Sequence, residues 1–127
     1  ILIAEDNDIN IQVLRRSLDP KGYAVDFAVN GEIAFEMFQR NDYDLVLMDI
    51  SMPVMDGTEA ARLIRKFEKE TAREATPIIA LSAHASDDHR DKFLRAGMDD
   101  FLAKPYKLDV LLQKMENWLN EPRKMAG

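Results

Sequence analysis

Short apolar runs alternate with amphipathic segments five times along this chain of 127 residues, and this alternation limits the possible fold more than any other feature of the sequence. The runs at 45–48 and 78–81 are unbroken, as expected of parallel strands that are covered on both faces. The other expected strands are 1–4, 23–29 and 100–103. Because Asp26 interrupts the apolar residues of 23–29, we expect that strand to lie at an edge of the sheet.

The segments between these runs carry apolar residues at helical spacing. Their start and stop signals predict helices that begin near Asn7 or Asp8 and then cover about 32–40, 58–71, Ser86 to Gly97, and 108–119. Strands and helices that alternate at this spacing form right-handed βαβ units. We therefore predict an α/β fold with a doubly wound, five-stranded parallel sheet.

Length and composition exclude several classes of protein. The length is that of one domain, expected at 1–120 and followed by a polar tail at 121–127. The absence of Cys excludes a disulfide scaffold and favours a cytoplasmic location. The apolar runs are far shorter than the roughly 20 residues of a membrane span, so we expect no membrane insertion. The net charge of -6 gives no electrostatic basis for direct nucleic-acid binding.

Polar side chains follow four of the five expected strands. Glu5 and Asp6 follow the first, Asp49 the third, Ser82 the fourth and Lys104 the fifth. In open α/β sheets the ligand site lies outside the carboxyl ends of the strands. These five side chains are therefore expected to converge on one cleft.

The residue types in this expected cleft indicate phosphoryl-transfer chemistry. Three carboxylates repel one another, and a hard divalent cation with oxygen ligands relieves the repulsion. Mg²⁺ fits a small site that keeps water ligands, with Mn²⁺ as the alternative ion. The cation and Lys104 together would neutralise a phosphoryl group, and the Ser82 hydroxyl could donate to one of its oxygens. Asp49 is then the nucleophile, because an ionised carboxylate needs no base.

Four segments of the chain carry a resemblance to a known family: AEDN at 4–7, LMDISMPVMDG at 47–57, ALSA at 80–83 and FLAKP at 101–105. In this order and spacing they resemble the receiver domain of two-component response regulators over nearly the whole chain. The resemblance implies a flavodoxin-like (βα)₅ fold with strand order 2-1-3-4-5. Glu5-Asp6-Asn7 followed by Asn10, together with 52–57, is most similar to the receivers of hybrid sensor histidine kinases.

The resemblance also assigns roles to residues of the expected cleft. Asp49 would accept a phosphoryl group from a phosphohistidine, with Lys104 as the cation that assists the transfer. Mg²⁺ would be held by Asp6, the Asp49 carboxylate and the backbone carbonyl of Ser51, while Glu5 would act through a bound water. The domain would then be a phosphoacceptor rather than an enzyme.

A conformational switch is implied by the same resemblance. Ser82 would move toward the phosphoryl group and Phe101 would turn inward, which changes the surface around the fourth helix and the fifth strand. Ser51 and His84 lie two residues after the acceptor and the switch hydroxyl, at positions that modulate dephosphorylation in this family. The peptide bond before Pro105 is expected to be cis.

The expected partner is a histidine kinase or a histidine phosphotransfer domain, with the receiver itself a monomer or a weak homodimer. The residues expected to dock this partner are Asn7, Ile9, Asn10, Ile11, Leu14 and Pro105. Ile9 and Ile11 are expected to be exposed. The inward face of the same helix would be supplied by Val13, Leu14 and Leu18.

Two other functions fit parts of the pattern. A phosphatase of the haloacid dehalogenase type also uses an Asp nucleophile and Mg²⁺ after a parallel strand, but it requires a second Asp at the position of Ser51. A pseudo-receiver that takes no phosphate would act only as an interaction module. The intact set of carboxylates, hydroxyl and lysine favours the phosphoacceptor over this alternative.

Overall fold

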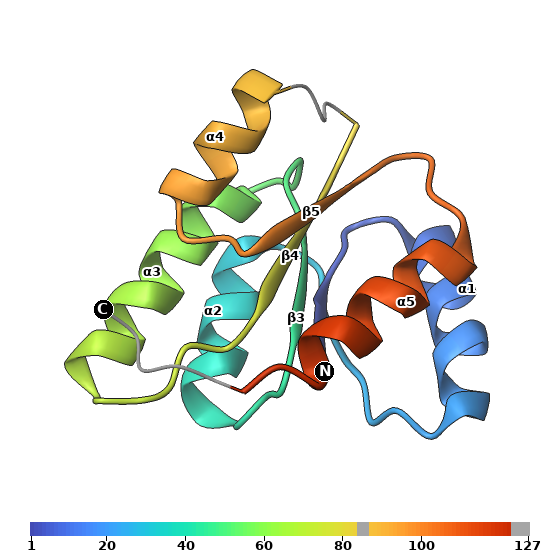
Figure 1. Cartoon of the computed structure of the whole chain (residues 1–127), viewed down its shortest axis with the longest axis horizontal. Helices are drawn as coiled ribbons and strands as arrows, with labels where there is room; N and C mark the ends of the chain where they lie inside the picture. The colour runs from blue at the N-terminus through green and yellow to red at the C-terminus, as the bar shows by residue number, and fades with distance from the viewer. Residues whose placement is uncertain (84–86, 123–127) are drawn as a thin grey trace.

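The computed structural model describes residues 1–83 and 87–122, and it contains one five-stranded parallel sheet (Figure 1). The strands are β1 (Leu2–Ala4), β2 (Asp26–Ala28), β3 (Val46–Asp49), β4 (Ile78–Ser82) and β5 (Asp100–Ala103). The helices are α1 (Asp8–Leu18), α2 (Gly31–Arg40), α3 (Gly57–Glu70), α4 (Asp87–Arg95) and α5 (Leu108–Leu119), with a 3₁₀ turn at Asp19–Lys21. The strand order is β2-β1-β3-β4-β5, so the predicted topology and the edge position of β2 are confirmed.

Helices cover both faces of the sheet: α1 and α5 pack on one face, and α2, α3 and α4 on the other (Figure 1). Successive strand residues point to opposite faces, so Val46 and Met48 join the core beneath α2 and α3 while Leu47 joins the core beneath α1 and α5. Burial on both faces explains why residues 46–48 of β3 and 78–81 of β4 are continuously apolar.

Three helices begin at polar side chains that satisfy free backbone N–H groups. The side chains of Asn7, Asn30 and Asp56 accept from the backbone N–H three residues further on, at the starts of α1, α2 and α3. These caps fix where each helix leaves the sheet. For this reason α1 and α3 begin directly beside the strand ends that carry the predicted site.

The inward face of α1 differs from the prediction. Ile11, Leu14 and Leu18 are buried, whereas Val13 is 56% exposed. The spacing i, i+3, i+7 places the first three on one helical stripe, and Val13 lies about 200° around the helix from Ile11 at 100° per residue. The prediction that Ile11 is exposed is therefore wrong, and Ile9 is exposed as expected.

Some predictions fall at boundaries or outside the described residues. The strand expected at 23–29 is limited to Asp26–Ala28, and α4 ends at Arg95, two residues before Gly97. The expected helix start at Ser86, the modulating residue His84 and most of the polar tail lie outside the described residues. Within the described part of the chain, no helix has the length and apolar character needed to cross a bilayer.

Candidate functional site

The predicted cleft residues come together at the carboxyl ends of β1, β3, β4 and β5. Asp49 and Ser82 are the last residues of their strands, and Glu5 and Lys104 each follow theirs directly. The backbone N–H of Lys104 donates to the Ser82 carbonyl at 2.8 Å, which continues the pairing of β4 with β5 up to the site. Glu5, Asp49 and Ser82 are only 2%, 4% and 5% exposed, so the cleft holds two buried carboxylates.

Lys104 is the cation that faces these two carboxylates. Its Nζ atom lies 3.0 Å from Oδ2 of Asp49 and 3.6 Å from Oε2 of Glu5, and its side chain is 27% exposed. The peptide bond between Lys104 and Pro105 is cis, as the family resemblance implied. One ammonium shared by two buried carboxylates leaves a net negative charge in the cleft, which favours a cation.

Three carboxylates have the arrangement of a metal site. Glu5, Asp6 and Asp49 each offer one oxygen, and these three oxygens lie within 4.8 Å of one another. Asp6 is exposed, so the cluster is open to solvent on one side. Carboxylate oxygens suit hard cations such as Mg²⁺, and an open side leaves room for the waters that Mg²⁺ retains. The donor set therefore fits the predicted ion.

The carboxylate of Glu5 is held in place by the start of α1. Its Oε1 atom accepts from the Asn10 side-chain amide at 2.9 Å and from the Asn7 backbone N–H at 3.3 Å. Burial raises the pKa of Glu5 above its ordinary value; the Asn10 hydrogen bond opposes this rise and the neighbouring Asp49 adds to it. A cation close to Glu5 would therefore favour its ionised form.

Tight backbone packing supports Asp49 from the β3–α3 loop. The Gly57 N–H donates to the Ile50 carbonyl at 3.0 Å, and a Cβ on Gly57 would lie only 2.4 Å from the Asp49 carbonyl oxygen. The Ser51 N–H donates to Oδ1 of Asp49 at 3.2 Å. From the sequence, residues 56–57 were interpreted only as a turn and as part of a family motif. The close approach of the Gly57 backbone to the Asp49 carbonyl, which requires glycine, is seen only in the three-dimensional structure.

The two predicted switch residues lie on neighbouring strands. Ser82 ends β4 and is buried, and Phe101 on β5 is partly buried against the core beneath α2, α3 and α4. The guanidinium carbon of Arg90 on α4 lies 5.4 Å from the centroid of the Phe101 ring. Phe101 is thus in contact with α4, the helix whose surface the predicted switch would change.

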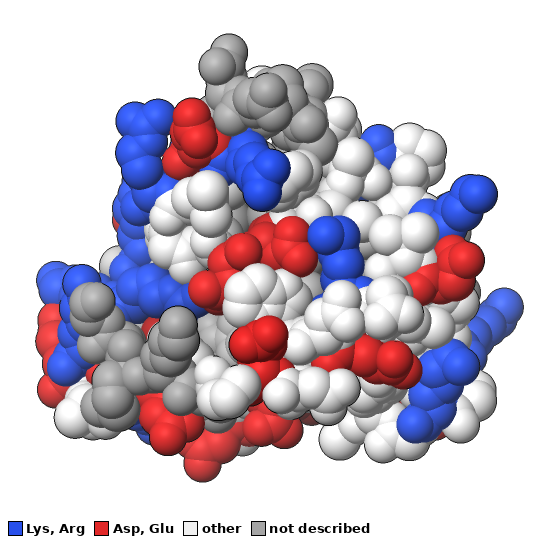
Figure 2. Space-filling model, viewed as in Figure 1, with Lys and Arg blue, Asp and Glu red and all other residues white. Residues whose placement is uncertain are grey.

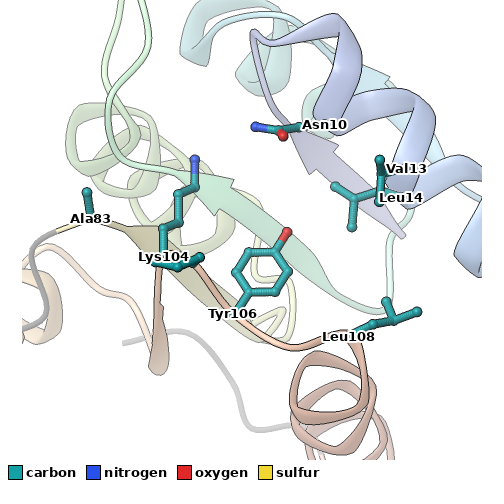
Figure 3. Close-up of a pocket in the computed structure, with 8 residues that line it drawn as sticks. Asn10, Val13, Leu14, Ala83, Lys104, Tyr106 and Leu108 are labelled. Carbon is teal, nitrogen blue, oxygen red and sulfur yellow. The ribbon is translucent and has the colours of Figure 1, made fainter.

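A cavity of about 500 Å³ lies between α1 and the β5–α5 connection, next to Lys104 (Figure 3). Three predicted docking residues, Asn10, Leu14 and Pro105, are among those that line it. Leu14 is only 2% exposed, because it also belongs to the inward stripe of α1. The other lining residues are Val13, Ala83, Lys104, Tyr106 and Leu108.

Sequence reasoning missed three of these cavity residues. Val13 is 56% exposed, although it was expected on the inward face of its helix, and Leu108 is 38% exposed at the start of α5. Tyr106 lies two residues after Lys104, and its nearness in sequence to the predicted cleft lysine is the signal that could have pointed to it. Burial, together with the negative charges of Glu5 and Asp49, raises the pKa of Tyr106 to about 12, so its hydroxyl stays protonated at neutral pH.

Charges of both signs are distributed over the face of the molecule that Figure 2 shows. Figure 2 shows Lys and Arg side chains over α3 and α4 on one side of the view, with Asp and Glu side chains among them. This mixed pattern agrees with the small negative net charge of the chain.

The fold and the cleft together define a doubly wound domain with an acidic site at the ends of its parallel strands. The family model described as the response regulator receiver domain matches residues 1–116. The chain therefore belongs to the receiver domains of two-component signalling.

Relatives and solved structures agree with this membership. The chain is 41% identical over 129 residues to hybrid signal transduction histidine kinase B of Dictyostelium discoideum, and the match covers 94% of the chain but 7% of that kinase. It is 39% identical to the receiver domain of the sensor histidine kinase PA1611 of Pseudomonas aeruginosa, with a TM-score of 0.83 and coverage of 94% of this chain and 96% of that one. The PA1611 structure contains a magnesium ion coordinated in its active site cleft.

A third similar structure contains a partner protein. The receiver domain of the response regulator Ssk1 of Saccharomyces cerevisiae was crystallised with the histidine phosphotransfer protein Ypd1. It gives 35% identity and a TM-score of 0.87, with coverage of 92% of this chain and 86% of that one.

Proposed function

We propose that this domain is a phosphoacceptor switch of a phosphorelay, in which Asp49 receives a phosphoryl group from a phosphohistidine in a reaction that depends on Mg²⁺. The observation that carries the proposal is the surroundings of Asp49, a buried carboxylate with Lys104 at 3.0 Å and with Glu5 and Asp6 beside it. The family of the chain and its hybrid-kinase relatives support the same role.

Each residue of the cleft has a separate role in the phosphoryl transfer. The phosphorus–nitrogen bond of the phosphohistidine breaks, a bond forms between phosphorus and a carboxylate oxygen of Asp49, and the electron pair of the broken bond stays with the imidazole. Lys104 carries the positive charge that stabilises the phosphoryl oxygens, and the Ser82 hydroxyl donates to one of them. A carboxylate is ionised at neutral pH, so no other side chain has to activate it.

The cation site is assigned to Glu5, Asp6, Asp49 and the backbone carbonyl of Ser51. When bound, Mg²⁺ supplies positive charge to the transferring phosphoryl group. Asp49 would contact the cation directly, while Glu5 would do so through water. The magnesium ion in the PA1611 receiver supports this assignment.

We assign the switch to Ser82 and Phe101. Movement of Ser82 toward the phosphoryl group would make room for the Phe101 ring to turn inward, away from Arg90 of α4. Phosphorylation can shift this equilibrium only through its different interaction energies with the two states. Ser51 and His84 would modulate the lifetime of the phosphorylated state.

We assign the docking of a histidine kinase or a histidine phosphotransfer domain to the α1 side of the cleft. The residues that would contact this partner are the exposed Asn7, Ile9, Asn10 and Pro105. Val13 replaces Ile11 in this set, because Val13 is exposed and Ile11 is buried. The Ssk1 receiver was crystallised with such a phosphotransfer protein, which supports the choice of partner. The domain would act as a monomer or weak homodimer within a hybrid histidine kinase.

Intact-mass measurement tests the acceptor. Wild type, Asp49→Asn and the control Asp42→Asn, at a side chain that is 97% exposed, are incubated with Mg²⁺ and acetyl phosphate. One phosphoryl adduct on wild type and on the control, and none on Asp49→Asn, is the expected result. An adduct that persists in Asp49→Asn would overturn the assignment, and no adduct on any protein would favour the pseudo-receiver.

A further inference from the structure

Asn10 belongs both to the cleft and to the surface beside it. Its side-chain amide donates to Oε1 of Glu5 at 2.9 Å, yet the residue is exposed and lines the cavity between α1 and the β5–α5 connection. Figure 3 shows its amide on the cleft side of α1, facing the same space as the Lys104 ammonium and the Tyr106 hydroxyl. The sequence motif placed Asn10 only among docking residues, and the proposed function assigns it no role in the cleft.

The start of α1 holds this amide in a fixed place. The Asn7 side chain accepts from the Asn10 backbone N–H at 3.0 Å, which caps the helix. The Asn10 side chain then reaches back past the cap to Glu5, and the Asn7 backbone N–H donates to the same Oε1 atom at 3.3 Å. Both donors therefore act on one oxygen of the carboxylate.

A Glu in this position needs such a restraint. Its side chain has one more rotatable bond than Asp, and a flexible carboxylate loses more conformational entropy when it is ordered around a cation. With Oε1 engaged by Asn7 and Asn10, Oε2 is the oxygen that faces Lys104, at 3.6 Å. The carboxylate is thus oriented before a cation arrives.

We propose that Asn10 is a positioning residue that orients Glu5 for the divalent cation and so connects the α1 surface to the metal site. This inference rests on the proposed function, because it assumes that Glu5 serves the cation.

Calorimetric titration with MgCl₂ tests the role of Asn10 directly. We expect Asn10→Ala to weaken Mg²⁺ binding by about tenfold, since groups that act on a metal site from outside its direct ligands contribute on that scale. Gln12→Ala is the matched control, because Gln12 is an exposed amide on the same helix, and it should leave the affinity unchanged. Urea denaturation of each variant establishes that the protein titrated is folded.

A double-mutant cycle separates positioning from a general effect on α1. In a Glu5→Ala background, Asn10→Ala should change the Mg²⁺ dissociation constant by less than about twofold, because Asn10 then has no carboxylate to orient. An equal loss with and without Glu5, or an Asn10→Ala affinity within twofold of wild type, would overturn the inference. Either of these two results could occur while wild type still accepts a phosphoryl group at Asp49. In that case the proposed function stands and only the role of Asn10 fails. Wild type that binds no Mg²⁺ would overturn both.

Discussion

The Nζ atom of Lys104 lies 3.0 Å from Oδ2 of Asp49, although 55 positions separate the two residues in the chain. The sheet brings them together, because β4 pairs with β3 on one side and with β5 on the other. Lys104 thereby offsets part of the repulsion between Asp49 and Glu5.

Replacing Lys104 should weaken both phosphorylation and stability. We expect Lys104→Met to slow formation of the phosphoryl adduct at Asp49 by about 10²-fold, since it removes a charge that stabilises the transferring group. It should also lower the free energy of unfolding by about 1–3 kcal/mol, because two buried carboxylates lose their shared hydrogen-bonding cation. Time-resolved intact mass and urea denaturation measure the two effects. The exposed Lys107→Met is the control, and equal behaviour of the two variants would contradict the prediction.

Mg²⁺ should stabilise the fold through the carboxylate cluster. A ligand at about 100 times its dissociation constant adds about 2.7 kcal/mol to the free energy of unfolding. We expect this increment in wild type, and a much smaller one in Asp6→Ala at the same Mg²⁺ concentration, when unfolding is followed by circular dichroism. Asp8→Ala is the control, since Asp8 is an exposed acid just outside the cluster. If Mg²⁺ raises the free energy of unfolding of Asp6→Ala as much as that of wild type, Asp6 is not a ligand of the cation.

The raised pKa of Glu5 predicts a pH dependence of stability in the absence of divalent cations. Burial is the main cause, so the folded state disfavours the ionised form relative to the unfolded chain, where the ordinary pKa is 4.5. The contribution of Glu5 to stability is then fully present below pH 4.5 and is lost as the pH rises through the raised pKa.

Urea denaturation in EDTA, at pH values from about 4 to 8, measures this loss as the difference between wild type and Glu5→Gln. We expect the unfolding free energy of wild type to fall relative to that of Glu5→Gln as the pH increases. Curves that stay parallel over the whole range would show that Glu5 has the same pKa in both states.

Arg65 should be the most costly ion-pair residue to replace on α3. Its guanidinium donates to Glu68 at 2.7 Å, to Asp99 at 2.7 Å and to the Gly97 carbonyl at 2.8 Å, which joins α3 to the α4–β5 connection. Glu68 is 0% exposed, so Arg65→Met leaves a buried carboxylate without its cation and should cost about 3–5 kcal/mol in urea denaturation.

Arg62→Met is the matched control for this measurement. Arg62 pairs with Glu59 at 3.6 Å, and both side chains are more than half exposed. Such a pair contributes about 0–1 kcal/mol. Similar losses in the two variants would mean that burial does not set the strength of the Arg65 interactions.

The class of fold and the chemistry of the cleft could be predicted from the sequence. The five apolar runs and the helical periodicity between them are local signals, and they gave the parallel sheet with β2 at its edge. The carboxyl ends of parallel strands lie at a common edge of the sheet. The polar residues that follow four of the strands were therefore enough to predict that Glu5, Asp49 and Lys104 lie in one cleft. The motifs at 4–7, 47–57, 80–83 and 101–105 gave the family, which the match over 1–116 confirms.

The environment of each side chain depends on how the helices pack on the sheet. Val13 and Ile11 exchanged their predicted environments, because a helix with several apolar residues can turn more than one stripe toward the sheet and packing selects among them. The contact of Asn10 with Glu5, the glycine that fits against the Asp49 carbonyl and the cavity beside Tyr106 all depend on distances between elements. Composition and periodicity specify which residues are apolar and in what order they occur. The distances between residues on different elements are set only when the helices pack on the sheet.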